Sequence, residues 1–361
     1  MKNNKPIVAI DLPIDGKGGG LYMSNLRVMN SSLNQHYEFK SFVYDSRLGK
    51  GISIKRIFDI KKQLKEINPD IVHFAGLQLA GFHMALACKL AGIKNTVVTV
   101  HGFSGEAIGF NPLKKIILTY LIEPLTLLLS KKIYGVSEYV VSRKVVRLFS
   151  YKCLGVIYNF PPALHITTNK NSIREELGLS SEAIIGVSVA RITKDKGYHI
   201  LDEAILNFKD QKNLKFIIVG QGDYLETMTD KLRDQIKNKQ VFLLGYREDI
   251  DTILSGCDFF ILPTLHETLS MALLEASMQK LALIASKTGG VPEIIEDNNN
   301  GLLVPPGNVQ ALANAILKIH NDHKMRDHFG ENAYKRVKEK FSIKNIEFKI
   351  DKVYQTLLSN K

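Results

Sequence analysis

The sequence contains no tryptophan, only three cysteines, and no apolar run long enough to cross a membrane. The three cysteines, Cys88, Cys153 and Cys257, are far apart and odd in number, which argues against a paired metal or redox motif. We expect each of them to be a buried residue that packs like a small apolar side chain. The richest apolar stretch, residues 116–129, is interrupted by a Glu-Pro pair and falls short of the roughly 20 residues that a transmembrane helix needs. We therefore expect a cytoplasmic protein without a spanning segment.

Acidic residues are the minority, with 36 Asp and Glu against 48 Lys and Arg, so the formal net charge is +12. Such a surplus favours anionic partners: phosphate-rich ligands, nucleic acid or anionic membrane surfaces. No helix-turn-helix, zinc-finger or aromatic RNA-binding motif is visible, so we expect no nucleic-acid partner. The chain has 361 residues, 45% of them apolar, which suits a globular protein of two ordinary domains or one large domain.

Short apolar runs alternate with longer amphipathic segments. This alternation predicts βαβ units and parallel sheets covered on both faces. Strands are expected at residues 7–10, 39–43, 71–74, 96–100, 132–136 and 155–158, and then at 184–190, 216–219, 241–244, 259–262 and 281–285. Helices are expected at 20–33, 53–67, 77–91, 112–129 and 138–149, then at 198–208, 224–237, 250–255, 270–279 and 309–321, with a basic helical tail over 325–358.

The alternation stops at the Pro161-Pro162 pair, and the polar stretch to residue 171 predicts an interdomain linker. We therefore predict an α/β protein with two doubly wound, Rossmann-like domains, residues 1–165 and 166–340, followed by residues 341–361. A ligand is expected in a cleft between the domains, at the carboxyl ends of the strands.

Two glutamates in the second half form the strongest motif. Glu267 follows an expected strand, so it should lie in a loop at the carboxyl end of that strand, and Glu275 should lie about a turn and a half into the next helix. Burying a carboxylate on that apolar helix without hydrogen bonds costs about 2–7 kcal/mol, and two ribose hydroxyls would supply donors. The alternative is that Glu275 turns to the surface and Glu267 caps the helix.

Two cations form the second motif. Arg191 ends an expected strand, and Lys196 with Gly197 opens the next helix. Two cations at a helix N-terminus suit a diphosphate, whereas the alternative is a pair of solvated surface charges.

The first half contains two weaker motifs. Three glycines at residues 18–20 follow the first strand and allow close backbone approach to a ligand, but they match neither the spaced-glycine dinucleotide fingerprint nor a Walker loop. His101 follows another strand, where it could bind a substrate hydroxyl or carry a proton. The alternatives are a flexible turn and a structural histidine.

The remaining motifs are strand-to-helix turns. Gly220 and the Gly245-Tyr246 pair could line a base or phosphate pocket, although most such turns are only structural. Residues 248–251 contain an Asp-x-Asp spacing that can hold a divalent metal, but they lie where a helix should begin and where acids are favoured. We therefore predict a helix start, with no required metal and no cofactor.

Together these motifs resemble glycosyltransferase family 4, the retaining group 1 glycosyltransferases of the GT-B fold. The resemblance covers nearly the whole chain and is most specific in the second half, where residues 189–197 are similar to the diphosphate-binding element and residues 267–295 to the donor-binding signature. Residues 300–305 are similar to the turn that follows it. The resemblance implies an N-terminal acceptor domain and a C-terminal nucleotide-sugar domain facing a cleft, with a final helix that packs back on the first domain.

The resemblance also implies roles for individual residues. Arg191 and Lys196 would neutralise the leaving diphosphate, Glu275 would hold the ribose, and Glu267 and His101 would lie near the sugar. The expected catalytic residues are His101, Arg191, Lys196 and Glu267, and the expected donor-binding residues are Gly19, Gly20, Arg191, Lys196, Gly220, Gly245, Tyr246, Glu267, Leu269, Ser270 and Glu275. Many members have Glu-Gly-Phe-Gly at the first glutamate; this chain has Glu267-Thr268-Leu269-Ser270, which leaves the donor open.

We therefore expect a hexosyltransferase that moves a sugar from a nucleotide-sugar donor, by family frequency a UDP-sugar, to a glycan or lipid-linked acceptor in cell-envelope polysaccharide biosynthesis. Basic residues flank the apolar segment 111–129 and recur over 53–65, which suits contact with an anionic membrane at its cytoplasmic face. A core helix with solvated ends is the alternative for the first segment. For function, the alternatives are a GT-B epimerase or hydrolase, a nicotinamide oxidoreductase and a basic nucleic-acid-binding protein.

Overall fold

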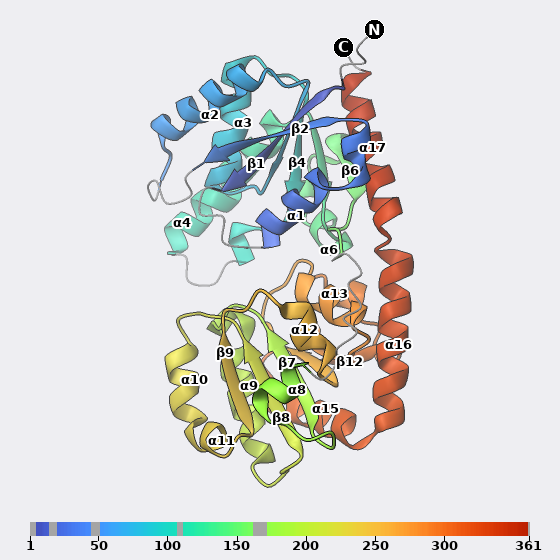
Figure 1. Cartoon of the computed structure of the whole chain (residues 1–361). Coiled ribbons are helices and arrows are strands. Elements are labelled where there is room, and N and C mark those ends of the chain that lie inside the picture. Colours follow the sequence, from blue (N-terminus) through green and yellow to red (C-terminus); the bar gives the residue numbers. More distant parts are fainter. Residues whose placement is uncertain (1–4, 14–19, 45–50, 107–110, 162–171, 360–361) are drawn as a thin grey trace. The chain divides into compact units, whose positions relative to one another are not determined.

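The computed structural model describes residues 5–13, 20–44, 51–106, 111–161 and 172–359, which form two compact units (Figure 1). The first unit comprises Met1–Phe160 and Phe341–Lys361, and the second comprises Pro161–Lys340. Each unit contains one six-stranded parallel sheet flanked by helices, which confirms the α/β prediction. Most of the predicted linker, from residue 162 to 171, lies outside the described residues.

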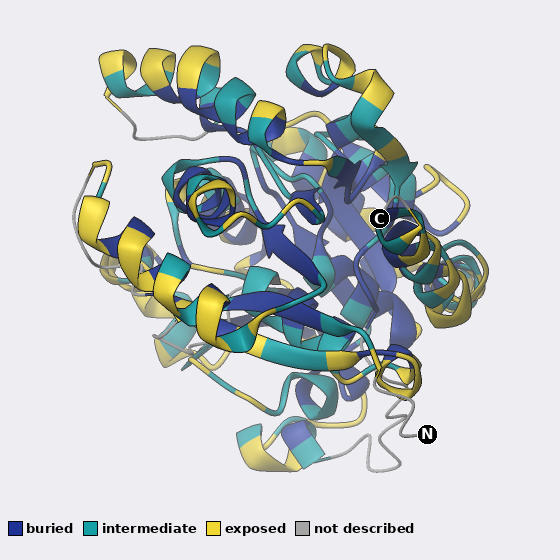
Figure 2. Cartoon of the chain, turned by 90° about the horizontal axis from the view of Figure 1, so that it is seen from above, coloured by how far each residue is buried: buried dark blue, intermediate teal, exposed yellow. Residues whose placement is uncertain are grey.

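The sheet of the first unit has the strand order β2-β1-β3-β4-β5-β6. Its central strands are buried along their whole length because helices cover both faces of the sheet, and Figure 2 shows buried strands beneath helices whose outer faces are exposed. The strands are β1 (Ile7–Pro13), β2 (Glu38–Tyr44), β3 (Ile71–Ala75), β4 (Thr96–Val100), β5 (Lys132–Gly135) and β6 (Cys153–Val156).

Helices of the first unit lie on both faces of its sheet (Figure 1). On one face, the last helix of the chain buries residues spaced three or four apart, including Ile346, Ile350 and Leu357, in a core shared with β1 and β3. The helices are α1 (Gly20–Met29), α2 (Ile54–Ile67), α3 (Leu79–Ala91), α4 (Pro112–Ile117), the π-helix η3 (Leu118–Ile122), α5 (Glu123–Leu129), α6 (Glu138–Val141), α7 (Lys144–Arg147) and α17 (Ile343–Leu358), with 3-10 turns η1 (Ser32–Gln35), η2 (Ser104–Glu106) and η4 (Ser150–Lys152).

The sheet of the second unit has the strand order β12-β11-β10-β7-β8-β9. The strands are β7 (Ile184–Val189), β8 (Leu214–Val219), β9 (Val241–Gly245), β10 (Phe259–Leu262), β11 (Ala282–Ser286) and β12 (Gly301–Val304). The helices are α8 (Ser172–Leu177), α9 (Tyr198–Ile205), α10 (Leu225–Lys231), α11 (Arg233–Lys237), α12 (Ile250–Ser255), α13 (Met271–Met278), α14 (Val291–Ile294), α15 (Val309–Asn321) and α16 (His323–Lys340), with 3-10 turns η5 (Lys194–Lys196) and η6 (Leu206–Phe208).

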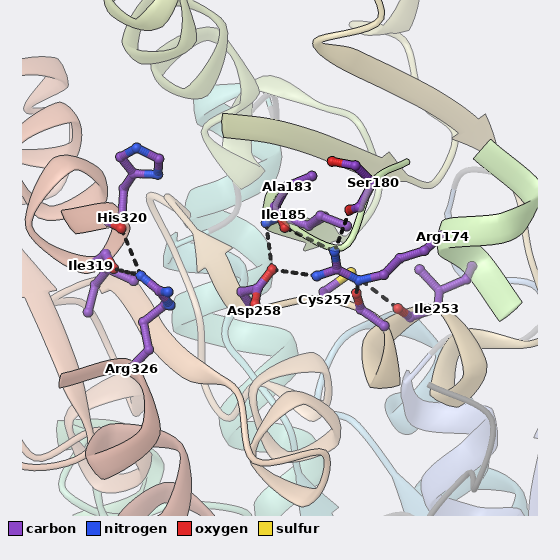
Figure 3. Close-up of polar contacts among 11 residues, drawn as sticks. Arg174, Ser180, Ala183, Ile185, Ile253, Cys257, Asp258, Ile319, His320 and Arg326 are labelled. Atoms are coloured by element: carbon purple, nitrogen blue, oxygen red, sulfur yellow. Dashed lines mark hydrogen bonds and ion pairs between the residues drawn. The ribbon is translucent and has the colours of Figure 1, made fainter. Parts of the chain in front are cut away.

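Two arginines of the second unit donate hydrogen bonds to backbone carbonyl oxygens (Figure 3). The Arg174 guanidinium of α8 donates to the carbonyl oxygens of Gly256 and Ala183 and to the carboxylate of Asp258, which also accepts from the Ile185 amide. These contacts join β7 to β10 at the sheet edge opposite their carboxyl ends. A second arginine, at position 326, donates to two terminal carbonyl oxygens of α15.

Several predicted elements differ from the structure. The single helices predicted at 138–149 and 224–237 are each two short helices, because the backbone leaves the helical conformation at Arg143 and Leu232. The predicted turn at 300–305 contains a sixth strand, β12; a Cβ at Gly301 would lie 2.5 Å from the carbonyl oxygen of Leu283, so glycine permits this pairing. The predicted helical tail consists of two helices, and the second begins after Ser342, its N-cap residue. Within the described part of the chain, no helix is long and apolar enough to cross a membrane.

Candidate functional site

Lys196 and Glu267, 71 residues apart, meet in the second unit. The Lys196 Nζ atom lies 2.9 Å from Glu267 Oε2, and both side chains are largely buried, at 18% and 14% exposure. Lys196 ends the turn η5 after β7, and Glu267 lies in the loop after β10, a strand that pairs with β7. The two predicted residues therefore lie together at the carboxyl edge of the sheet, where ligands bind in open α/β folds.

Close backbone packing holds both residues of this ion pair in place. Gly197, with φ +77°, has no room for a side chain, because a Cβ there would lie 1.8 Å from the carbonyl oxygen of Pro263. Gly289, with φ +52°, is equally restricted, since its Cβ would lie 1.6 Å from the carbonyl oxygen of Glu267. The Gly290 amide donates to that same oxygen at 3.1 Å. The loop of Glu267 is thus clamped between the segments that follow β7 and β11.

The helix α13 begins directly after this loop. Ser270 occupies its N-cap position, and the Ser270 hydroxyl accepts a hydrogen bond from the Leu273 amide at 3.2 Å. The Leu269 side chain, which stands where many family members have phenylalanine, is buried, and so is Ser270, which stands where they have glycine. Glu275 is half-buried in the second turn of α13, which confirms its predicted position in the helix.

The other predicted donor-binding residues of the second unit follow β7, β8 and β9. The Arg191 guanidinium is 73% exposed, and its Nη2 atom lies 3.5 Å from Asp195 Oδ2. The Gly220 amide donates to the carbonyl oxygen of Gly245 at 2.8 Å, and Tyr246 after it is exposed. These residues share the sheet edge that holds Lys196 and Glu267. The edge therefore presents a largely buried lysine, an exposed arginine and two glycine turns.

The acidic segment 248–251 is a helix start, as predicted. Helix α12 begins at Ile250, and Asp249 pairs with Arg247 at 2.7 and 2.6 Å. Asp251 accepts from the Thr252 amide. No group of three or more His, Cys, Asp or Glu side chains that could hold a metal ion occurs within the described residues.

In the first unit, His101 follows β4 and is half-buried as a residue. Desolvation of its ring lowers the pKa of His101 from 6.5 to about 4, so the imidazole is neutral at pH 7. It can act there as a hydrogen-bonding group rather than as a cation. Gly20 is the first residue of α1, and Gly19 lies outside the described residues.

Models of two families match the chain. Residues 26–160 match the model described as glycosyltransferase family 4, and residues 169–336 match the one described as glycosyl transferases group 1. The chain belongs to the group 1 glycosyltransferases of family 4. It is therefore a glycosyltransferase enzyme, and its two sheets form the two Rossmann-like domains of a GT-B fold.

The chain aligns with known glycosyltransferases over most of its length. It is 28% identical to a UDP-Gal:alpha-D-GlcNAc-diphosphoundecaprenol alpha-1,3-galactosyltransferase of Escherichia coli, over 85% of this chain and 81% of that protein. It is 26% identical to the capsular polysaccharide biosynthesis glycosyltransferase CapM of Staphylococcus aureus, over 87% of each chain. The crystal structure of Anabaena HepE with UDP and glucose has the same fold, with a TM-score of 0.79 at 20% identity, over 97% of this chain and 99% of that one.

Sequence reasoning missed two buried acids in the first unit of this glycosyltransferase. Asp11, on β1, accepts from the Ala75 amide and from Asn25, and burial raises the pKa of Asp11 from 3.8 to about 7. Glu123, at the start of α5, accepts from the Ser104 amide, and burial raises its pKa as well. Each acid sits in an otherwise apolar stretch, which is the signal that could have identified it.

Proposed function

We propose that this glycosyltransferase transfers a sugar, with retention of anomeric configuration, from a UDP-sugar to a lipid-linked acceptor in cell-envelope polysaccharide biosynthesis. The main support is the buried Lys196–Glu267 pair, 2.9 Å apart, at the strand edge that also holds Arg191. The name of the E. coli relative specifies a UDP-galactose donor and a diphosphoundecaprenol acceptor, and HepE was solved with UDP. Both observations favour a UDP-linked donor for this chain, and the name of the E. coli relative favours a lipid-linked acceptor.

In the proposed reaction, negative charge develops on the departing UDP, and fixed cations stabilise that charge where it forms. An ammonium group has three N–H donors, so Lys196 can bind diphosphate oxygens with two of them while the third stays hydrogen-bonded to the Glu267 carboxylate. Arg191 supplies a second, planar donor. The positive charge that a divalent metal would otherwise provide is thus available from side chains, and we propose that no metal is required.

We propose donor contacts for two further residues, Glu275 and His101, and a second role for Glu267. The Glu275 carboxylate accepts from the two ribose hydroxyls, and Glu267 accepts from a hydroxyl of the donor sugar. Neutral His101 hydrogen-bonds another sugar hydroxyl. The acceptor hydroxyl attacks the anomeric carbon from the face that the UDP leaves, so the C–O bond to UDP breaks as the new C–O bond forms. The departing phosphate oxygen takes the acceptor proton.

A thermal-shift screen tests the donor site. We expect UDP to stabilise the protein, by about 2.7 kcal/mol at a hundredfold excess over its dissociation constant, and GDP, ADP and NAD to have little effect. Glu275→Ala and Lys196→Ala should abolish the shift. Lys280→Ala is the matched control, because it removes a lysine of the second unit that pairs with Glu331 on the surface. Stabilisation by another nucleotide alone would contradict the UDP proposal.

Product analysis tests the reaction itself. We expect consumption of the UDP-sugar to require an acceptor with a lipid diphosphate, and proton NMR of the product to show the anomeric configuration of the donor. Donor consumption without any acceptor would instead support an epimerase or hydrolase. An inverted product would contradict the retaining mechanism.

A further inference from the structure

One helical segment of the first unit exposes an apolar face to solvent. Leu113, Ile116, Ile117, Tyr120 and Leu121, on α4 and the π-helix η3, are between 45% and 78% exposed. Their spacing places them on a single side of the helix. We call these five residues the apolar face.

The opposite side of the same segment is buried. Leu118 and Ile122 pack against Phe82 of α3 in a small apolar cluster. The segment therefore has two apolar sides, one inside the unit and one in solvent. The alternative interpretation of this segment is a core helix. That interpretation is correct for α5, where Thr126 and Leu127 are buried, but it is wrong for the apolar face, which is exposed.

Helix α2 adds exposed apolar side chains next to lysines. Ile54 is 70% exposed and Phe58 is 53% exposed, and the Lys61 ammonium lies 5.2 Å from the centre of the Phe58 ring. Both α2 and α5 pack on α3, so α2 and the helix with the apolar face lie on the same side of the sheet (Figure 1).

Charge is distributed very unequally between the two units. The first unit holds 26 Lys and Arg against 12 Asp and Glu, a formal charge of +14, whereas the second holds 22 against 24, a formal charge of −2. Lys114 and Lys115 lie between Leu113 and Ile116 in the chain, and no acidic residue occurs between positions 107 and 122. Lys114 borders the apolar face, because it lies three residues before Ile117 on the helix. An exposed apolar face with basic residues and no acids matches an anionic lipid surface.

We propose that the apolar face docks this glycosyltransferase on an anionic bilayer, with its five side chains in the headgroup boundary and Lys114, at the margin of the face, on lipid phosphates. The inference rests on the proposed lipid-linked acceptor and deepens it, because docking by the first unit would bring the enzyme to a substrate held in the membrane. A second copy of the chain fits this face less well, since self-association would bring like charges together.

A tryptophan reporter tests whether the apolar face enters lipid. The chain has no tryptophan, so Tyr120→Trp introduces a single fluorophore on the face. With vesicles of phosphatidylglycerol and phosphatidylcholine we expect a blue shift, and quenching by brominated acyl chains. The matched control is Phe348→Trp on α17, which is 59% exposed on a helix that packs on the other face of the sheet.

Three outcomes of this experiment would overturn the proposal. The first is a fluorophore at position 120 that stays in water when the anionic vesicles are added. The second is an equal response from position 348. The third is a blue shift without vesicles that grows with protein concentration, because that result identifies the face as a contact between copies.

Vesicle flotation measures how much each side chain contributes to membrane binding. We expect Ile116→Ser and Leu121→Ser each to weaken binding about tenfold, the equivalent of about 1.4 kcal/mol, and Lys114→Gln about fivefold, with Phe348→Ser unchanged. Binding should fall at high salt and on pure phosphatidylcholine. Unaltered flotation of the serine variants would contradict the docking surface. The UDP thermal shift of the same variants separates this failure from a failure of the proposed donor site.

Discussion

Each of the two units contains its own six-stranded parallel sheet, but the two units differ in net charge and in where charged side chains are buried. The second unit is nearly neutral, and it holds the largely buried Lys196–Glu267 pair at the carboxyl ends of its strands, where close glycine contacts fix the backbone. The first unit is strongly basic overall, yet it buries two acids, Asp11 and Glu123, and exposes an apolar face. The difference shows that one architecture can carry either a largely buried ion pair at its strand ends or an exposed apolar face. Variants in the second unit should therefore change donor chemistry, and variants in the first should change stability and surface binding.

The largest effect is expected from Lys196→Ala in the second unit. Loss of this cation should lower kcat about 10²–10³-fold, by analogy with a lost oxyanion donor, because charge on the leaving group is no longer stabilised. Steady-state kinetics with the UDP-sugar measures the effect. Lys280→Ala should keep full activity. A decrease of less than threefold for Lys196→Ala would remove this residue from the proposed site.

The next effect concerns Asp11 in the first unit. Burial raises its pKa from 3.8 to about 7, so the folded protein binds this proton more tightly than the unfolded chain does. The stability contributed by this group is fully present below about pH 4 and is lost as the pH rises to about 7. We expect Asp11→Asn to be more stable than the wild type at pH 8, by about 2–4 kcal/mol, and similar to it near pH 4.

Thermal unfolding of both proteins across this pH range measures the difference. Asp59→Asn, at an exposed position on α2, is the matched control and should follow the wild type at every pH. Parallel pH profiles for Asp11→Asn and the wild type would show that the Asp11 carboxyl is not destabilised by burial.

A smaller effect is expected where α17 packs on the first sheet. The Tyr354 hydroxyl lies 2.8 Å from His73 Nδ1, and His73 Nε2 contacts the hydroxyls of Thr99 and Tyr134 at 2.7 and 3.0 Å. Tyr354→Phe leaves the buried Nδ1 atom without this partner, which should cost about 1–3 kcal/mol in the free energy of unfolding. Urea unfolding measures the cost, with Tyr151→Phe as the exposed control. Equal losses in both variants would argue against a role for this contact.

The smallest effect is expected from a surface network of the second unit. Arg247 binds the carboxylates of Glu176 and Asp249 at distances of 2.6 to 3.0 Å, but both acids are more than 40% exposed. Arg247→Ala should therefore cost at most about 1 kcal/mol, and less at high salt. Urea unfolding at low and high ionic strength measures it. A larger loss in the free energy of unfolding that high salt does not reduce would show that the Arg247 contacts are stronger than solvent-exposed ion pairs.

Much of the fold could be predicted because buried parallel strands are short continuous apolar runs. The strand predicted at 184–190 is β7 (Ile184–Val189), and the helix predicted at 309–321 is α15 (Val309–Asn321). Strand β12 was missed because it is short and begins with Gly301, a residue that weakens a strand pattern. The helices at 138–149 and 224–237 were predicted too long, since a break in the backbone at one residue leaves the apolar pattern unchanged.

The sequence by itself determined the α/β class, the family and the residue types at the proposed donor site, because strand periodicity and motif spacing are local properties. Tertiary structure decided which of these residues meet. Lys196 and Glu267 come together because β7 and β10, far apart in the chain, are neighbours in the sheet. It also decided that Asp11 is buried and that Tyr120 is exposed. Burial depends on neighbours supplied by distant segments, and the pattern of a single helix or strand does not contain them.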